Sequence, residues 1–323
     1  MPKIAFLTPT MPALRQEMIS YLPPGFKIEF AQKNDKNTHR EVLQGADYVF
    51  IGATWLDDEL MASSPQLKMI QKWGIGVDKI DIEAARLRGI PVAITNGANA
   101  GQVAEQAILL MLASLRRLAY AQKSLLAGQW VNAELKTTCF QLSDKTVGLF
   151  GFGNIAKKVA QQLSGFNVRL IYYSRQRASE EDESKYCAEY VDPDVLFSQS
   201  DVLSLHAPLN AQTHQIVNQK TLSKMKSSAI IVNTARGELI HEGDLVHAIR
   251  HQHIFGAGLD VFDHEPPDMS NPLFTLDNIV VTPHAGASVK EAVTSVIQHG
   301  LRNITLFEKG LALDERDWIV KPR

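Results

Sequence analysis

Short apolar runs recur along the whole chain at intervals of roughly 20 to 30 residues, and amphipathic stretches separate them. The runs are rich in Val, Ile, Leu and Phe, and Gly, Pro or Asn often follows them. Near-continuous apolar runs are typical of parallel strands that helices cover on both faces. The alternation therefore predicts repeated β-α-β units and an α/β fold built on doubly wound parallel sheets.

The runs form two series, and each series predicts one sheet. The first series comprises Ile4 to Leu7, Ile28 to Ala31, Tyr48 to Ile51, Met69 to Lys72 and Val92 to Thr95. The second comprises Thr146 to Phe150, Arg169 to Tyr173, Tyr190 to Val191, Val202 to Leu205, Ala229 to Asn233, Ala257 to Asp260 and Ile279 to Thr282.

Two helical stretches connect the predicted sheets. Val103 to Leu118 contains no Gly or Pro and is rich in good helix formers, so we expect one uninterrupted helix there. Val289 to Phe307 predicts a second helix, and no strand-rich block follows it. We expect residues 1–101 and 287–323 to form a flavodoxin-like domain and residues 102–286 to form a Rossmann domain.

A glycine-rich turn follows the first strand of the second series. Gly151, Gly153 and Ala156 form a G-x-G-x-x-A pattern, and Asn154 and Ile155 open the helix that follows. In such a turn the first glycine permits a tight bend, the second lets the backbone approach a pyrophosphate, and the small third residue lets helix and strand pack closely. The phosphates lie at the helix N-terminus, where backbone N–H groups face them. The turn therefore predicts a dinucleotide-binding site.

The end of the next strand indicates which dinucleotide is preferred. NAD sites place a carboxylate about 20 residues beyond the glycines, where it binds the ribose 2′-hydroxyl. This chain has Ser174, Arg175 and Arg177 in that region instead. Because a guanidinium pairs well with the extra 2′-phosphate of NADP, we expect NADPH to be preferred and NAD to be possible. The alternative interpretation is a pair of solvated surface arginines.

Three further segments follow predicted strands of the second series and offer Arg236, Glu265 and His284. A cation can hold a carboxylate and polarise a carbonyl, and a protonated imidazole can supply the proton that the oxygen needs when the carbon receives a hydride. A carboxylate beside the imidazole stabilises its protonated form. Each residue alone also fits a solvated turn, so the prediction depends on their meeting at one edge of the sheet.

Composition excludes several other classes of protein. Lys plus Arg total 33 and Asp plus Glu total 35, so the chain lacks the positive field that non-specific nucleic-acid binding needs. The two cysteines fit neither a disulfide framework nor a zinc site, which favours a reducing, cytoplasmic setting. The longest apolar stretch, Ala107 to Leu115, is too short to span a membrane. We interpret His247, His251 and His253 as a solvated polar face and expect no metal, since no Glu follows His247 as in H-E-x-x-H.

Several ordered segments carry a resemblance to a known family. They are Gly74 to Asp81, Asn99 to Glu105, Gly151 to Ala156, His206 to Leu209, Asn233 to Gly237, Asp260 to Pro266 and Pro283-His284. Over nearly its whole length the chain resembles the D-isomer-specific 2-hydroxyacid dehydrogenases, nearest the NADP-dependent glyoxylate/hydroxypyruvate reductase branch. The resemblance implies an enzyme that reduces a small 2-oxo acid to the D-2-hydroxy acid with NAD(P)H.

The resemblance also implies roles for individual residues. Arg236, Glu265 and His284 would be catalytic, and the backbone of Ile75 and Gly76 would hold the substrate carboxylate together with Arg236 and His284. Further cofactor contacts are implied at Val103, His206, Pro208, Thr234, Ala235, Asp260, Arg236 and His284. The first domain would be the substrate domain, and the helix from Val103 would form the core of a homodimer.

Two other functions stay open at this point. Phosphoglycerate dehydrogenases usually have Arg-Ser shortly before a Thr in the first domain, whereas Ile51-Gly52 precede Ala53-Thr54 here, so the cation for a substrate phosphate is missing. Some relatives of this fold act as corepressors, which bind the cofactor mainly to switch protein assembly and can retain Arg, Glu and His. Formate dehydrogenases fit less well, because they generally have Gln where Glu265 stands.

Overall fold

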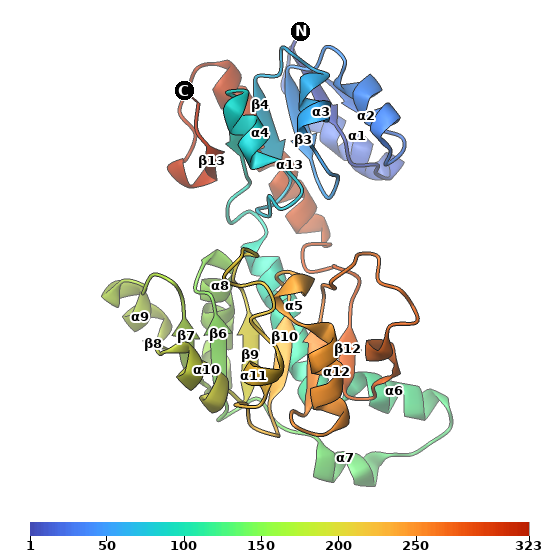
Figure 1. The fold of residues 1–323 in the computed structure, drawn as a ribbon, viewed down its shortest axis with the longest axis vertical. Coiled ribbons are helices and arrows are strands. Elements are labelled where there is room, and N and C mark those ends of the chain that lie inside the picture. The colour runs from blue at the N-terminus through green and yellow to red at the C-terminus, as the bar shows by residue number, and fades with distance from the viewer. Residues whose placement is uncertain (323) are drawn as a thin grey trace. The chain divides into compact units, whose positions relative to one another are not determined.

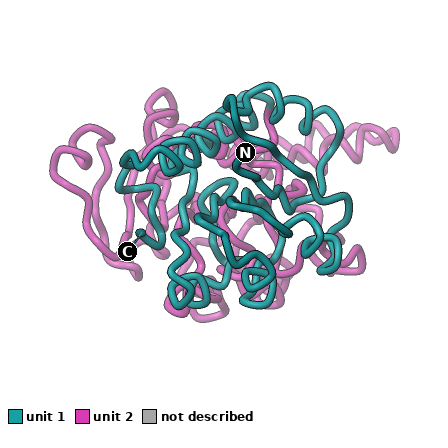
Figure 2. Tube along the Cα trace, turned by 90° about the horizontal axis from the view of Figure 1, so that it is seen from above, with its two compact units in different colours: residues 1–99, 290–323 teal, residues 100–289 magenta. Residues whose placement is uncertain are grey.

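The computed structural model describes residues 1–322, and the chain divides into two compact α/β units. Unit 1 comprises residues 1–99 and 290–323, and unit 2 comprises residues 100–289 (Figure 2). Each unit is built on one sheet, which confirms the predicted fold class. Within residues 1–322, no helix combines the length and the apolar character that crossing a bilayer requires.

The sheet of unit 1 has the strand order β13-β5-β4-β3-β1-β2 (Figure 1). Its strands are β1 (Lys3–Phe6), β2 (Lys27–Phe30), β3 (Tyr48–Ile51), β4 (Met69–Lys72), β5 (Val92–Ala93) and β13 (Trp318–Val320). Strands β1 to β5 are parallel, and β13 runs antiparallel to β5. The helices of unit 1 are α1 (Pro12–Ser20), α2 (Lys36–Leu43), α3 (Asp58–Ala62), α4 (Ile82–Leu87) and α13 (Lys290–Glu308).

Alternate residues of these strands pack against two different helix layers. Ile4 and Phe50 belong to the apolar cluster that α1 and α13 cover. Ala5 and Val49 belong to the cluster that α2, α3 and α4 cover. Because both faces of the sheet are buried, its strands have near-continuous apolar sequences.

Strand β13 corrects the prediction that no strand follows the C-terminal helix. The strand has only three residues, Trp318–Val320, and is too short to be recognised as an apolar run in the sequence. They form a strand because β5 offers a free edge, with Trp318 opposite Ala93 and Val320 opposite Val92. The edge is a tertiary feature that the local sequence does not contain.

The sheet of unit 2 has the strand order β12-β11-β10-β9-β6-β7-β8, and all its strands are parallel. The strands are β6 (Thr146–Phe150), β7 (Arg169–Tyr173), β8 (Ala188–Tyr190), β9 (Val202–Leu205), β10 (Ile230–Asn233), β11 (Gly256–Leu259) and β12 (Ile279–Val281). The helices are α5 (Ala100–Leu115), α6 (Leu118–Leu126), α7 (Asn132–Thr138), α8 (Asn154–Leu163), α9 (Glu180–Tyr186), α10 (Pro193–Gln199), α11 (Gln219–Leu222) and α12 (Glu242–Arg250). The strand order reverses between β6 and β9, and ligands of such sheets bind at the carboxyl ends of the strands beside this reversal.

The helix predicted from Val103 to Leu118 ends earlier than expected. α5 stops at Leu115, and Arg117 adopts a left-handed conformation with φ +49° before α6 begins. The Arg117 Nη1 donates to Glu134 Oε1 at 2.8 Å and to Thr138 Oγ1 at 3.0 Å, both on α7. These partners lie far along the chain, so local helix propensity did not reveal the break.

Candidate functional site

The turn between β6 and α8 has the shape of a pyrophosphate site. Gly151 has φ +98°, and an added Cβ there would lie 2.7 Å from the backbone nitrogen of Ala207, so a side chain does not fit. An added Cβ at Gly153 would meet no atom within 4 Å, which leaves open space beside the turn. Ala156 is fully buried where α8 packs against the sheet. Asn154 and Ile155 form the first turn of α8, where backbone N–H groups favour an anion.

The loop after β7 contains the two predicted phosphate-binding arginines, and one of them is engaged by an acid. The Arg177 guanidinium donates through Nε and Nη2 to the two carboxylate oxygens of Glu183, each at 2.8 Å. This pairing, together with the Tyr172 hydroxyl, lowers the pKa of Glu183 to about 2. Arg175 is exposed, and within residues 1–322 its side chain has no ion pair. Arg175 therefore remains accessible to a ligand, whereas Arg177 is fixed to α9.

Tyr172 connects this loop to the glycine turn. Its ring stacks on Phe152, with 4.1 Å between the ring centroids, and its hydroxyl donates to Glu183 at 2.6 Å. The same hydroxyl accepts the backbone N–H of Ala178 at 2.9 Å. Burial, followed by the hydrogen bond to Glu183, raises the pKa of Tyr172 to about 12. The loop that begins at Ser174 is thus held against the turn.

The segments after β9 and β10 extend the same edge of the sheet. His206 Nε2 hydrogen-bonds with Ser204 Oγ at 2.9 Å, and burial lowers the pKa of His206 to about 4, so the imidazole is neutral at pH 7. Pro208 is exposed beyond it. The buried hydroxyl of Thr234 has no hydrogen-bond partner within residues 1–322. A buried hydroxyl without a partner fits a ligand that supplies one, and the adjacent Ala235 N–H donates to Asn233 Oδ1 at 3.0 Å.

His284 and Glu265 form a hydrogen-bonded pair. The distance between His284 Nδ1 and Glu265 Oε2 is 2.7 Å, and Glu265 Oε1 accepts the backbone N–H of Phe262 at 3.2 Å. Glu265 follows β11 and His284 follows β12, which are neighbouring parallel strands. Their carboxyl ends bring together two residues that are 19 positions apart. Because Nδ1 contacts the carboxylate, Nε2 is the ring nitrogen available to a substrate.

Arg236 lies at the end of the adjacent strand β10, and its Nη1 donates to the Ala235 carbonyl at 2.6 Å. Gly237 follows directly, and an added Cβ there would lie 1.9 Å from the carbonyl carbon of Phe262. Only glycine permits this close approach between the Arg236 segment and the segment that leads to Glu265. The ends of β10, β11 and β12 therefore gather Arg236, Glu265 and His284 at one edge of the sheet.

Val103 and Asp260 lie beneath the His284 turn. Both are buried, and the two Asp260 carboxylate oxygens accept hydrogen bonds from residues 282–286. A Cβ at Gly286 would lie 3.6 Å from Val103 and 3.0 Å from Asp260. In this structure both residues support the turn from below.

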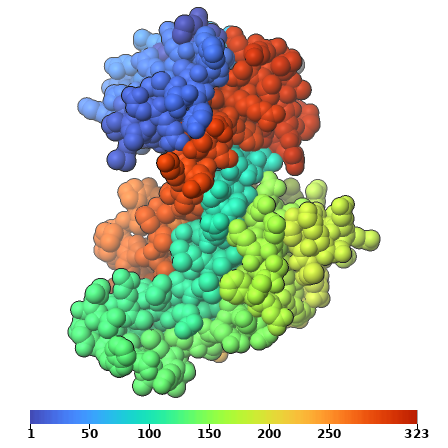
Figure 3. All heavy atoms as spheres, turned by 180° about the vertical axis from the view of Figure 1, so that it is seen from behind, coloured from blue at the N-terminus to red at the C-terminus, as the bar shows by residue number. Residues whose placement is uncertain are grey.

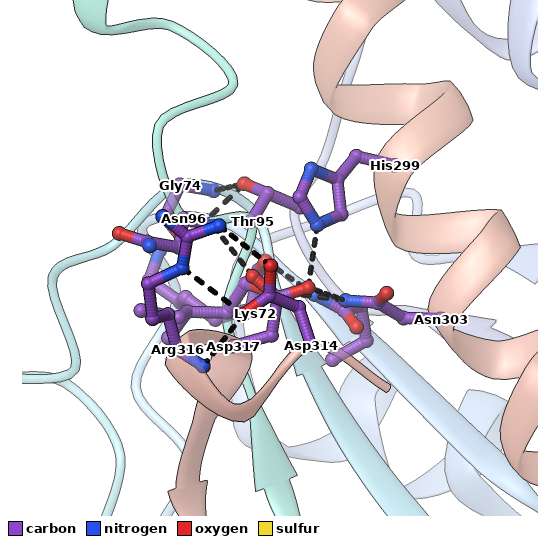
Figure 4. Close-up of polar contacts among 11 residues, drawn as sticks. Lys72, Gly74, Thr95, Asn96, His299, Asn303, Asp314, Arg316 and Asp317 are labelled. Atoms are coloured by element: carbon purple, nitrogen blue, oxygen red, sulfur yellow. Dashed lines mark hydrogen bonds and ion pairs between the residues drawn. The ribbon is translucent and has the colours of Figure 1, made fainter. Parts of the chain in front are cut away.

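Ile75 and Gly76 lie in unit 1, in the loop after β4. Within residues 1–322, their backbone N–H groups donate to no protein acceptor. The preceding Gly74 has φ +87°, and its N–H donates to Thr95 Oγ1 at 2.9 Å (Figure 4). Lys72 stabilises the start of the loop, since its Nζ donates a hydrogen bond to the Trp73 carbonyl at 2.9 Å. Two adjacent backbone donors without an acceptor suit an anion such as a carboxylate.

The histidine cluster lies at the end of α12. His247 is in the helix, whereas His251 and His253 follow its last residue, Arg250. The rings of His247 and His251 stack with 4.0 Å between their centroids. Among the described residues, no group of three or more His, Cys, Asp or Glu side chains is arranged to hold a metal ion.

Sequence reasoning missed Glu183 and the role of Gly237. An acidic run, Glu180 to Glu183, follows Arg177 closely and signals that a carboxylate could pair with it. Which acid pairs depends on how α9 packs, so the sequence alone does not identify Glu183. The need for glycine at position 237 arises from the approach of a segment about 25 residues further on, which only the fold reveals.

Comparisons with known proteins agree with the geometry. Residues 108–286 match the family model "D-isomer specific 2-hydroxyacid dehydrogenase, NAD binding domain". The chain is 41% identical over 261 residues to a hydroxypyruvate reductase of Thermotoga maritima, which covers 80% of this chain and 83% of that protein. It is 39% identical over 260 residues to a glyoxylate reductase of Thermococcus litoralis, covering 79% of this chain and 78% of that protein.

A solved glyoxylate reductase from Paecilomyes thermophila superposes with a TM-score of 0.85 at 30% sequence identity, over 98% of each chain. The resemblance that the ordered motifs indicated is thus confirmed. The chain belongs to the D-isomer specific 2-hydroxyacid dehydrogenase family of oxidoreductases, and residues 108–286 match the family's NAD-binding domain.

Proposed function

We propose that the protein reduces a small 2-oxo acid of the glyoxylate or hydroxypyruvate type to its D-2-hydroxy acid. The observation that carries the proposal is the 2.7 Å contact between His284 Nδ1 and Glu265, at the same sheet edge as Arg236. Relatives that are named hydroxypyruvate reductase and glyoxylate reductase support this substrate class.

Each of the three side chains has a separate task. A bound nicotinamide cofactor supplies the hydride. His284 holds a proton at Nε2 and donates it to the substrate oxygen, since Nδ1 is bound to Glu265. The Glu265 carboxylate binds Nδ1 and keeps the imidazole oriented, so that Nε2 is left for the substrate. Arg236 holds the substrate carboxylate and polarises the carbonyl.

The residues that would hold the cofactor are those of the β6–α8 turn and the neighbouring strand ends. The open space beside Gly153 and the unpartnered hydroxyl of Thr234 fit a bound dinucleotide. Arg175 is exposed after β7 and fits a 2′-phosphate, which supports a preference for NADPH over NADH. Because Arg177 is paired with Glu183, Arg175 is the main source of that preference.

In unit 1, we assign the binding of a substrate carboxylate to the backbone of Ile75 and Gly76. The N–H groups of Ile75 and Gly76 are adjacent donors without a protein acceptor in residues 1–322, so they suit this anion. Unit 1 is therefore proposed as the substrate domain and unit 2 as the cofactor domain, in the order expected from the sequence.

A homodimer is part of the same proposal. Large apolar side chains are exposed between residues 109 and 130, on α5, α6 and the turn after α6: Leu109, Leu118, Leu125, Leu126 and Trp130. Trp130 is 82% exposed, and the α6–α7 segment forms part of the surface seen in Figure 3 (green). Exposed apolar patches of this kind mark protein interfaces.

The cytoplasmic setting expected from the sequence also stays part of the proposal, and both cysteines are free thiols.

A substrate panel tests the proposed reaction. Purified protein is assayed with NADPH and with NADH against glyoxylate, hydroxypyruvate, pyruvate and phosphohydroxypyruvate, and the hydroxypyruvate product is analysed on a chiral column. We expect turnover of glyoxylate or hydroxypyruvate, D-glycerate as the chiral product, and a higher kcat/KM with NADPH. No turnover of any 2-oxo acid, or formation of L-glycerate, would contradict the proposal.

A further inference from the structure

A buried polar cluster lies behind the loop of Ile75 and Gly76, entirely within unit 1. Its centre is Asp317, which is 3% exposed and follows the C-terminal helix α13 in the chain. Figure 4 shows His299 and Asn303 extending from α13 toward this carboxylate. Asp317 Oδ2 accepts His299 Nε2 at 2.7 Å and Asn303 Nδ2 at 3.2 Å. The reaction proposed above does not use any of these three side chains.

The cluster fixes the backbone on both sides of Thr95. On one side, the Ile94 N–H donates to the Asp317 carbonyl at 2.8 Å, and Asn303 Nδ2 donates to the Ile94 carbonyl at 3.2 Å. On the other side, the Asn96 N–H donates to Asp317 Oδ1 at 3.2 Å. Three backbone groups that flank one residue are thus bound by Asp317 and Asn303. Buried hydrogen bonds of this kind restrict a segment to one conformation.

Thr95 in turn holds Gly74. The Thr95 hydroxyl accepts the Gly74 N–H at 2.9 Å and lies 3.4 Å from the Gly74 carbonyl, which also accepts the Thr95 N–H at 3.1 Å. Thr95 is completely buried, and Gly74 has φ +87°. Since both backbone groups of Gly74 are bound by one residue, the direction in which the chain leaves Gly74 is fixed. The next two N–H groups along the chain are those of Ile75 and Gly76.

We infer that Thr95, fixed by Asp317, is a positioning residue for the carboxylate of the 2-oxo acid. It acts through Gly74, by holding the N–H groups of Ile75 and Gly76 in the orientation that receives the anion. Asp317, in the C-terminal segment, thereby contributes to substrate binding through Thr95 and Gly74, although neither Asp317 nor Thr95 touches the substrate. The inference rests on the proposed function, because it assigns the substrate carboxylate to these two N–H groups.

The substitution Thr95→Val tests this role, because it removes the hydroxyl and keeps the shape of the side chain. We expect the KM for hydroxypyruvate to rise about tenfold, which corresponds to about 1.4 kcal/mol, because the buried hydrogen bond to the Gly74 N–H is lost. The kcat should change less than about threefold and the Kd for NADPH less than about twofold, because neither the proton donor nor the cofactor turn is altered. Thr95→Ser retains the hydroxyl and should restore the KM.

A second readout does not depend on activity. Hydrogen–deuterium exchange of the peptide that spans residues 73–77 should be faster in Thr95→Val and close to that of the original protein in Thr95→Ser. Asp317→Asn should change the KM and the exchange in the same direction. Glu315→Gln is the control, because the exposed Glu315 lies in the same segment and its side chain pairs with Lys321.

The outcomes separate this inference from the proposed function. If the unaltered protein reduces no 2-oxo acid, the proposed function fails, and the exchange experiment still tests whether Thr95 holds the loop. If the protein is active but Thr95→Val leaves both KM and exchange unchanged, the positioning role is wrong. The role is also wrong if exchange rises while the KM stays constant, or if Thr95→Ser fails to restore the KM.

Discussion

The backbone N–H of His284 donates to the carbonyl oxygen of Asp260 over 2.8 Å. The Asp260 carboxylate completes the support of the same turn: Oδ1 accepts Thr282 Oγ1 at 2.5 Å and the Ala285 N–H at 2.7 Å, and Oδ2 accepts the Gly286 N–H at 2.8 Å. His284 has φ +51°, a left-handed conformation that residues other than glycine rarely adopt. Asp260 therefore holds the proposed proton donor in an uncommon backbone conformation.

Asp260→Asn should weaken both activity and stability. The substitution replaces one acceptor oxygen by an NH2 group, which then faces a backbone or hydroxyl donor. We expect kcat/KM to fall about 100-fold because His284 is displaced, and the free energy of unfolding to fall by about 1–3 kcal/mol because a buried donor loses its partner. Steady-state kinetics and urea denaturation measure the two effects. Asp263→Asn, in the same loop, is the control, and equal behaviour of the two variants would contradict the assignment.

Arg175 and Arg177 should respond differently to replacement by Ala. Arg175→Ala is expected to raise the Kd for NADPH about tenfold or more and to leave the Kd for NADH unchanged, because it removes the accessible cation. Arg177→Ala should change the two Kd values by similar factors, because Arg177 is bound to Glu183. Quenching or enhancement of cofactor fluorescence on titration gives both constants.

Glu183→Gln is the companion variant for the cofactor loop. It should behave like Arg177→Ala, and the double variant should be no weaker than either single one, because the two residues act as a pair. A selective loss of NADPH binding in Arg177→Ala, with Arg175→Ala normal, would reverse the roles of the two arginines.

Glu265→Gln should slow the reduction of 2-oxo acids. The carboxylate lies 2.7 Å from His284 Nδ1 and holds the imidazole ring in place, whereas an amide at this position can turn its NH2 group toward the same nitrogen. We expect kcat/KM for hydroxypyruvate to fall about 100-fold because the proton donor is displaced, and the Kd for NADPH to stay the same. The control is Glu189→Gln, which neutralises an exposed acid on β8 that pairs with Arg169, at the opposite edge of the sheet. A Glu265→Gln variant that keeps the kcat/KM of the control would argue against the pairing.

His206 should make the stability of the protein depend on pH. Burial lowers its pKa from 6.5 to about 4, so between these values the unfolded chain binds a proton that the folded protein does not. Stability from this group is therefore present above pH 6.5 and is lost as the pH falls toward 4. The contribution should fall by about 2 kcal/mol between pH 7 and pH 5. Urea denaturation at the two pH values measures this change in the free energy of unfolding. Between pH 7 and pH 5, His206→Asn should lose less stability than the original protein. The control His214→Asn, which replaces an exposed histidine, should lose as much as the original protein.

Residues that act at strand ends were largely predictable from the sequence. Parallel strands place their carboxyl ends at one edge, so Arg236, Glu265 and His284 could be assigned to one edge once three apolar runs were recognised as neighbouring strands. The glycine turn was predictable for a similar reason, because the need for Gly151 and Gly153 arises within one β-α unit. In these cases the sequence pattern and the fold depend on the same local geometry.

Contacts between distant segments were not predictable. The backbone beside Thr95 is held by Asp317, whose carboxylate accepts the N–H of Asn96 from 221 positions away in the chain. Strand β13 depends on the free edge of β5, and the pairing of Arg177 depends on how α9 packs. Each of these features requires that two elements already be placed side by side, and no local pattern of residues encodes that placement.

The proton-donor role of His284 is the central claim, and one kinetic comparison tests it most directly. The kcat/KM for hydroxypyruvate with NADPH is measured for the original protein, for His284→Ala and for the control His253→Gln, which changes an exposed histidine outside the site, together with the Kd for NADPH. Loss of a general acid reduces rates by about 10²- to 10⁴-fold, so the kcat/KM of His284→Ala should fall by that factor. The kcat/KM of His253→Gln should stay close to that of the original protein, and both variants should bind NADPH normally. A His284→Ala variant that binds NADPH and retains near-normal kcat/KM would contradict the account.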